Sequence, residues 1–295
     1  MMKTICTGAF IVALLAPLSM PVPAAAQPSS PQQQAPRVPT ATPAPLVPTL
    51  QNSQVDIAYV PPRDAKFQPM YERLKNLQVL EEFRQFLAPL RLPRRLAIRL
   101  DQCGAATHSY APGQGVVICY EFIEEIGQLV PTNNDRQVML VGTFVQVMLF
   151  DVSLAVFDML EVPVWGREND AADRLAALLM LQFGEDIAYQ TIVGVANFFV
   201  LTKKTWTGSD FADVTSPDAQ RFYNYLCIAY GGDPRTFAFL VKKEKEILPK
   251  DRAERCSDEY EQVRTAFYLR IMPHVDPDLM TAVRAMRWPV LAGGK

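Results

Sequence analysis

The side chains that most often do chemistry in enzymes are scarce in this sequence. Only two of its 295 residues are histidines, His108 and His274, and they lie far apart in the chain. Histidine is the commonest zinc ligand and a frequent general base. Zinc sites need three or four protein ligands, so two distant histidines do not by themselves predict one. In the simplest interpretation, His108 lies in a surface turn and His274, beside Pro273, follows a helix end.

Carboxylates are more concentrated, and five of them lie within one stretch of the chain: Asp151, Asp158, Glu168, Asp170 and Asp173. Oxygen ligands of this kind suit Ca²⁺ or Mg²⁺. Most of them also have an ordinary role in a helix. Glu168 and Asp170 are expected in a first helical turn, where negative charge complements the helix dipole. Asp173 is expected to anchor the turn or to pair with an arginine such as Arg167. We favour these roles over a dedicated cation site.

The first 26 residues have the pattern of a secretory signal peptide. Lys3 precedes an apolar stretch at 9–16, and three alanines at 24–26 form a small-residue cleavage site. Prolines interrupt the apolar run before the roughly 20 residues that a membrane anchor needs. We therefore expect an exported protein, periplasmic or secreted. Residues 27–53, rich in Pro and Gln, are predicted to form a disordered spacer before a domain at 54–295.

Four cysteines remain after removal of the signal peptide: Cys103, Cys119, Cys227 and Cys256. An even number in an exported chain indicates disulfides. Of the three possible connectivities, pairing of sequence neighbours is the simplest, and each bond would contribute about 2–4 kcal/mol. A four-thiolate zinc site is the alternative, but the C-x-x-C spacing of such sites is absent.

The hydrophobic pattern of the domain predicts an α+β fold. Alternating apolar residues predict strands over 54–60, 95–100 and 115–120. Apolar residues at helical spacing predict helices over 67–90, 121–129, 134–161, 168–202, 216–230, 233–247 and 253–271. Strands followed by helices indicate a small N-terminal sheet packed on a mostly helical body.

One predicted helix is apolar almost throughout. Residues 138–160 are long enough to cross a membrane. However, Gln146, Asp151 and Asp158 lie within the stretch, and a carboxylate at the bilayer centre costs at least about 2.5 kcal/mol. We interpret the segment as a long central helix buried in the domain, and expect no transmembrane segment in the mature chain.

Two segments in the middle of the chain, 150–160 (FDVSLAVFDML) and 162–173 (VPVWGRENDAAD), resemble the core of the DUF4344 family of exported, gluzincin-like metallopeptidases. Residues 150–160 resemble the helix that carries H-E-x-x-H in the family. Residues 162–173 resemble its Pro-x-x-Gly-x-Glu-Glu-Asp-Ala-Ala-Asp stretch. Weaker likeness extends over 103–121, 221–234 and 252–256. The resemblance covers nearly the whole mature chain and implies a zincin-like fold.

The family's motif has a clear chemical purpose. Two histidines four residues apart share one zinc ion, and the glutamate between them acts as general base on the zinc-bound water. In this sequence the matching positions hold Phe150, Asp151 and Leu154, and Asn169 stands at the expected third ligand. Phenylalanine and leucine have no donor atom, and asparagine is a weak neutral ligand for zinc. The resemblance therefore implies a degenerate motif.

These residues lead to a functional prediction with alternatives. We expect a pseudoenzyme that binds a protein or peptide ligand, with no catalytic residues, no zinc and no other cofactor. The resemblance implies that the position beside His108 belongs to the strand near the substrate cleft. The remnant cleft is therefore expected to contain His108 as well as Asp151, Glu168, Asp170 and Asp173. An active peptidase with a displaced metal site is the first alternative, and a purely structural envelope protein is the second. The 29 basic and 31 acidic residues nearly cancel, so nothing indicates a nucleic-acid partner.

Overall fold

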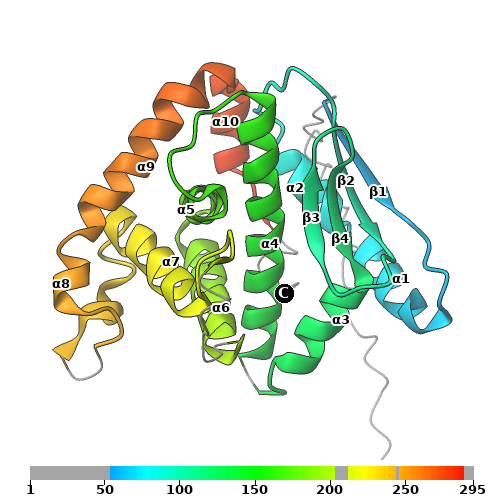
Figure 1. The fold of residues 1–295 in the computed structure, drawn as a ribbon, viewed down its shortest axis with the longest axis horizontal. Helices are drawn as coiled ribbons and strands as arrows, with labels where there is room; N and C mark the ends of the chain where they lie inside the picture. The colour runs from blue at the N-terminus through cyan, green and yellow to red at the C-terminus, as the bar shows by residue number, and fades with distance from the viewer. Residues whose placement is uncertain (1–53, 134, 203–211, 244–245, 289–295) are drawn as a thin grey trace, which may run out of the picture. The chain divides into compact units, whose positions relative to one another are not determined.

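The computed structural model describes residues 54–133, 135–202, 212–243 and 246–288. The predicted signal peptide and spacer lie outside these residues. The described part is α+β, as predicted: a four-stranded mixed sheet stands beside a larger helical body (Figure 1).

The sheet has the strand order β1-β2-β4-β3. Its strands are β1 (Val55–Tyr59), β2 (Leu96–Asp101), β3 (His108–Ala111) and β4 (Gly115–Cys119). The first three in this order are parallel, and β3 runs antiparallel to β4. The apolar side chains of β2 and β4 are buried, which accounts for the alternating pattern in the sequence.

The sequence did not predict strand β3. It has only four residues, no run of apolar side chains, and only intermediate or exposed positions, so it lacks the pattern of a half-buried strand. Pairing with β4 through a tight turn creates it, with His108 opposite Ile118. As an edge strand, β3 lies beside the long helix α4 (Arg136–Met159; Figure 1). His108 is therefore a strand residue, as the family resemblance implies, and the interpretation as a surface turn residue was wrong.

The helical body contains the following α-helices: α1 (Gln68–Asn76), α2 (Val79–Phe86), α3 (Tyr120–Leu129), α4 (Arg136–Met159), α5 (Glu168–Met180), α6 (Glu185–Thr202), α7 (Asp218–Gly232), α8 (Lys250–Ala253), α9 (Cys256–Arg270) and α10 (Pro277–Arg284).

Several predicted helices are shorter than expected. The helix predicted over 67–90 is interrupted at Gln78, which has a left-handed backbone (φ 56°). The one predicted over 168–202 is divided at Gly184 (φ 91°), since glycine takes this conformation at little cost. The prediction over 233–247 was wrong: its described part forms only a short 3-10 turn. Periodic apolar residues reveal a helical face, but they do not locate breaks within it.

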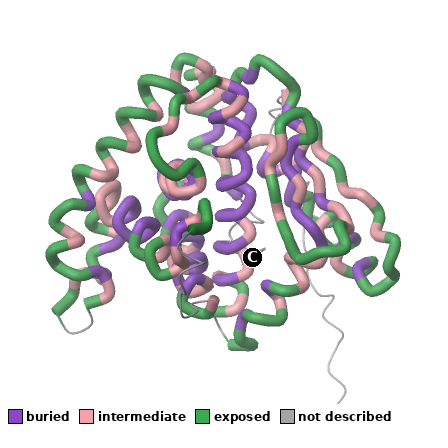
Figure 2. The backbone as a smooth tube through the Cα atoms, in the orientation of Figure 1, coloured by how far each residue is buried: buried purple, intermediate pink, exposed green. Residues whose placement is uncertain are grey.

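Helix α4 is the centre of the fold. It contacts α5 and α6 on one side and β3 and β4 on the other. Figure 2 shows it as mostly buried. Among the described residues, it is the helix long and apolar enough to span a membrane, but 78% of its most apolar window is buried inside the fold. The prediction of a long buried central helix is confirmed.

Both predicted disulfides are present. Cys103 and Cys119 connect the segment after β2 to the end of β4, with Cα atoms 5.5 Å apart. Cys227 and Cys256 connect α7 to the start of α9, with Cα atoms 4.9 Å apart. Two disulfides are compatible with an oxidising, exported environment.

Candidate functional site

The positions that resemble the metal motif lie where α4 passes the edge strand β3. Phe150 is buried, Asp151 is 1% exposed, and Leu154 is half-buried. Residues four positions apart lie on the same face of a helix, so Phe150 and Leu154 share one face and Asp151 lies next to that face. Leu154 contributes to the apolar core, as a leucine in this position would be expected to do.

His108 and Asp151 form the first polar contact at this place. Nδ1 of His108 lies 2.9 Å from Oδ2 of Asp151, and the imidazole is 24% exposed while the carboxylate is buried. Burial raises the pKa of Asp151, and the hydrogen bond from His108 lowers it in part. The other oxygen of Asp151, Oδ1, is buried with no hydrogen-bond partner among the described residues.

Phe150 lies between this pair and a second polar cluster. On one side its ring meets the imidazole of His108 edge-on, with centroids 5.9 Å apart. On the other side the guanidinium of Arg221 lies 5.8 Å from the centre of the Phe150 ring. The second ring against His108 is that of Phe122, at 4.9 Å. An aromatic side chain thus occupies the space between the two clusters.

The second cluster surrounds Asp173. Nε and Nη2 of Arg221, from α7, donate to its two oxygens at 2.7 and 3.0 Å. The hydroxyl of Tyr225 donates at 3.1 Å and the amide of Gln146 at 3.3 Å. Burial alone lowers the pKa of Arg221, but the attraction of Asp173 outweighs it and the net pKa is raised. Burial and the charge of Asp173 raise the pKa of Tyr225. The expected pairing of Asp173 with an arginine is confirmed, but the arginine is Arg221 of α7 and not Arg167.

The N-terminus of α5 forms a third group. Glu168 and Asp170 occupy its first turn, as predicted, and Glu168 is exposed. The amide of Asn169 donates to Oγ1 of Thr215 at 2.8 Å, and Ser216 donates to Asp170 at 2.8 Å. These bonds attach α5 to the segment before α7.

Two further contacts of Asp158 on α4, one with β3 and one with the segment before β2, were not predicted. The hydroxyl of Tyr110 donates to Asp158 at 2.5 Å, and Arg94 forms an ion pair with the same carboxylate at 2.9 Å. Burial and the neighbouring carboxylate raise the pKa of Tyr110 to about 12, while the bond from Tyr110 lowers that of Asp158. Alternate residues of a strand share one face, so His108 and Tyr110 both reach α4. That spacing was the available signal, but it required β3 to be recognised.

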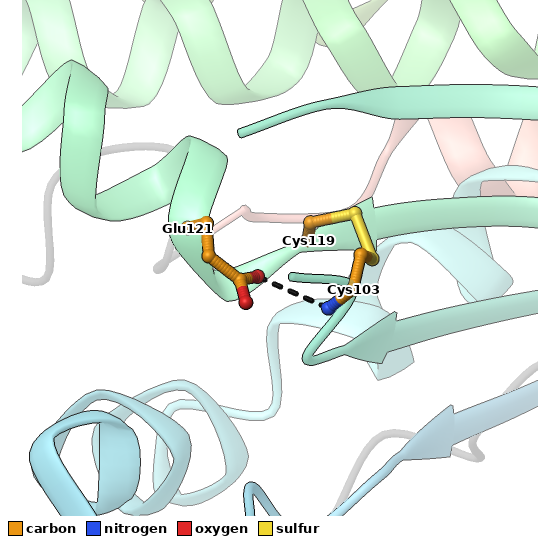
Figure 3. Close-up of side chains that lie close together, drawn as sticks. All are labelled: Cys103, Cys119 and Glu121. Carbon is orange, nitrogen blue, oxygen red and sulfur yellow. Dashed lines mark hydrogen bonds between the residues drawn. A yellow bond between two sulfur atoms is a disulfide. The ribbon is translucent and has the colours of Figure 1, made fainter. Parts of the chain in front are cut away.

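One group of potential metal ligands occurs among the described residues, and it is elsewhere. Cys103, Cys119 and Glu121 lie close together (Figure 3). The two sulfur atoms form a disulfide and are therefore not thiolates. Glu121 accepts hydrogen bonds from the backbone amides of Cys103 and Gly104 at 3.1 and 2.8 Å. This group stabilises the end of β4 and the start of α3.

Comparison with known proteins identifies the family. The family described as "Putative metallopeptidase" (DUF4344) matches residues 59–269, which include both polar clusters and α4. The chain therefore belongs to this family. No curated protein and no solved structure matches it.

Proposed function

We propose that this protein is a non-catalytic member of its metallopeptidase family, exported from the cell, whose fold serves to bind or scaffold a protein or peptide. The observation that carries the proposal is the place of Phe150. Its ring lies between His108 and Arg221 at the position where the family resemblance expects the first zinc-binding histidine.

The donor chemistry at the motif positions does not fit zinc. Phe150 and Leu154 offer no donor atom, and Asn169 offers only a neutral amide whose nitrogen already bonds Thr215. Two potential donors remain, His108 and Asp151, and they bond each other. Zinc in a catalytic site takes three protein ligands and a water. His108 and Asp151, which are directed at one another, do not supply the three protein ligands that such a site needs.

The remaining carboxylates support the same proposal, because their partners belong to the protein itself. Asp173 accepts four hydrogen bonds from three side chains. Asp158 is held by Tyr110 and Arg94. A carboxylate with its oxygens engaged in this way stabilises the fold and is a poor general base, since a base must reach the proton that it removes. The two disulfides fit an exported scaffold.

Metal analysis of the purified full chain tests the proposal. After incubation with excess zinc and desalting, we expect well under one zinc per chain and no chelator-sensitive cleavage of a peptide library. The matched variant carries four changes: Phe150→His, Asp151→Glu, Leu154→His and Asn169→Glu. It is expected to retain zinc, because it regains two imidazoles and two carboxylates at the family's spacing.

Two outcomes contradict the proposal. Stoichiometric zinc in the unaltered chain, removed by a chelator together with a peptidase activity, would establish the alternative of an active enzyme with a displaced site. In that case His108→Phe should remove the zinc. A folded quadruple variant without zinc would show that these four positions are not the family's ligand positions. Circular dichroism of each variant identifies those that fail to fold.

A further inference from the structure

The outer side of α9 is unusually accessible for a helix of this fold. Its inner side packs on α7 through Cys256 and Tyr260, and Phe267 lines an apolar cavity together with Val152 and Leu175. The opposite side borders an open groove of about 720 Å³, whose other wall is the loop between α4 and α5. In Figure 1 α9 lies along an edge of the fold, and Figure 2 shows its outer residues as exposed.

Two large apolar side chains that line the groove are exposed to solvent. Trp165, from the α4–α5 loop, is 96% exposed, and Leu269 of α9 is 69% exposed. Both line the groove. Tryptophan is enriched among the residues that dominate binding energy at protein interfaces. A tryptophan and a leucine exposed side by side therefore mark this face as an interaction surface.

Three charged residues of α9 line the groove. Glu261 is paired with Arg264 of the same helix, and the other two, at the two ends of the helix, have opposite signs. Asp258 lies in the first turn, and Arg270 is the last residue of the helix. Both are exposed, and neither forms an ion pair with another described residue. They are twelve residues apart, about 18 Å along the axis. The centre between them holds the small residues Thr265 and Ala266, which allow another helix to approach closely.

The charges on this face of α9 are complementary to those on the same face of a second copy of the chain. If a second α9 is laid antiparallel on the first across a twofold axis near Thr265, Asp258 of each chain faces Arg270 of the other. Both ion pairs then form at once, because a twofold interface brings the same surface of each chain together. Trp165 projects from the neighbouring loop, where it can cover the partner's helix. A ligand of uniform charge would match only one end.

We propose that this protein forms a twofold symmetric dimer through the outer face of α9 and Trp165. One helix face and one tryptophan make a smaller contact than the roughly 800 Å² per partner of a standard interface. The dissociation constant is therefore expected in the micromolar range, and the monomer predominates when dilute.

Charge reversal tests the arrangement, with the full chain studied by sedimentation over about 1–500 µM. Asp258→Arg and Arg270→Asp, each alone, place like charges opposite one another at two symmetric sites and should weaken the dimer at least tenfold. The two changes together restore the opposite charges and should return the dissociation constant to within about threefold. Arg287→Asp, an exposed reversal elsewhere, is the matched control.

The double variant distinguishes the loss of a contact between two chains from the loss of stability within one chain. Arginine in the first turn and aspartate in the last both oppose the helix dipole, so their effects on stability should accumulate. Only a direct contact between Asp258 and Arg270 of two chains makes the double variant associate better than either single one. Trp165→Ala should weaken the dimer without lowering the melting temperature. A monomer at every concentration, or a dimer indifferent to the reversals, overturns the proposal.

A covalent test does not depend on affinity. In a chain that also carries Cys6→Ser, Thr265→Cys places one new thiol near the proposed axis, while the cysteines at 103, 119, 227 and 256 are already in disulfides. Under mild oxidation we expect a disulfide-linked dimer, and none from the exposed control Lys75→Cys. Equal cross-linking of both variants, or none with Thr265→Cys, contradicts the twofold arrangement.

Discussion

The two carboxylates on either side of Phe150 differ in how completely they are hydrogen-bonded. Asp173 accepts four hydrogen bonds from Arg221, Tyr225 and Gln146. Asp151 accepts one from His108, and its second oxygen has no partner among the described residues. Both are 1% exposed. The difference therefore comes from the partners that the neighbouring elements supply, and not from burial.

The physical consequence is a difference in how far hydrogen bonds compensate each carboxylate for the loss of water. A buried carboxylate bonded on both sides by a guanidinium is stable when ionised. Asp151 has one partner, and burial raises its pKa because the single hydrogen bond from His108 offsets only part of the lost hydration. The Asp173 cluster thus serves as a permanent link between α4, α5 and α7. The contact of Asp151 with His108 is a weaker link between α4 and β3.

The largest expected effect concerns Arg221. Arg221→Met leaves Asp173 as a buried charge without its cation and should destabilise the fold by about 3–5 kcal/mol. Chemical denaturation measures this. Asp173→Leu combined with Arg221→Met removes both charges and should recover most of the loss. The exposed pair of Arg264 and Glu261 is the matched control, for which Arg264→Met should cost at most about 1 kcal/mol. Equal losses for Arg221 and Arg264 would contradict the structural role of the Asp173 cluster.

The second effect concerns His108 and depends on pH. His108→Phe removes the one hydrogen bond to Asp151 and should cost about 1–3 kcal/mol near pH 8. The loss of that bond raises the pKa of Asp151 further above its unfolded value of about 3.8. A raised carboxyl pKa favours the folded state at low pH, and this contribution is lost as pH rises through the folded pKa.

The variant should therefore lose more stability near pH 8 than near pH 4.5, as measured by urea unfolding at both values. Adding Asp151→Leu to His108→Phe removes the carboxyl and should abolish the difference between the two pH values. A deficit independent of pH in the single variant would mean that Asp151 is not the titrating group.

The smallest effect concerns the ring that separates the clusters. Phe150→Leu keeps an apolar side chain but removes the aromatic contacts to His108 and Arg221. We expect a loss of about 1 kcal/mol beyond the change in buried area, seen as a lower denaturation midpoint. In a double-mutant cycle, Phe150→Leu and Arg221→Met should be non-additive by at least about 0.5 kcal/mol. Strict additivity would show that the ring and the guanidinium do not interact energetically.

The sequence predicted the parts of the fold that depend on local pattern. The buried helix around Asp151, the strands β1, β2 and β4, and both disulfides follow from apolar periodicity and cysteine spacing. The break at Gln78 did not follow, because nothing in its side chain requires a left-handed backbone. Strand β3 did not follow either, because the partner strand β4 creates it rather than its own composition.

By itself the sequence determined which chemistry the motif positions can supply, since a phenyl ring and an isobutyl group have no donor atoms in any fold. It also determined the family, through the residues around Phe150 and Asp173. Only the tertiary structure decided the partners. The arginine of Asp173 comes from Arg221, 48 residues further along, and the imidazole of Asp151 comes from a strand 43 residues earlier. Contacts over such separations depend on how helices and strands pack, and local sequence patterns carry no information about that packing.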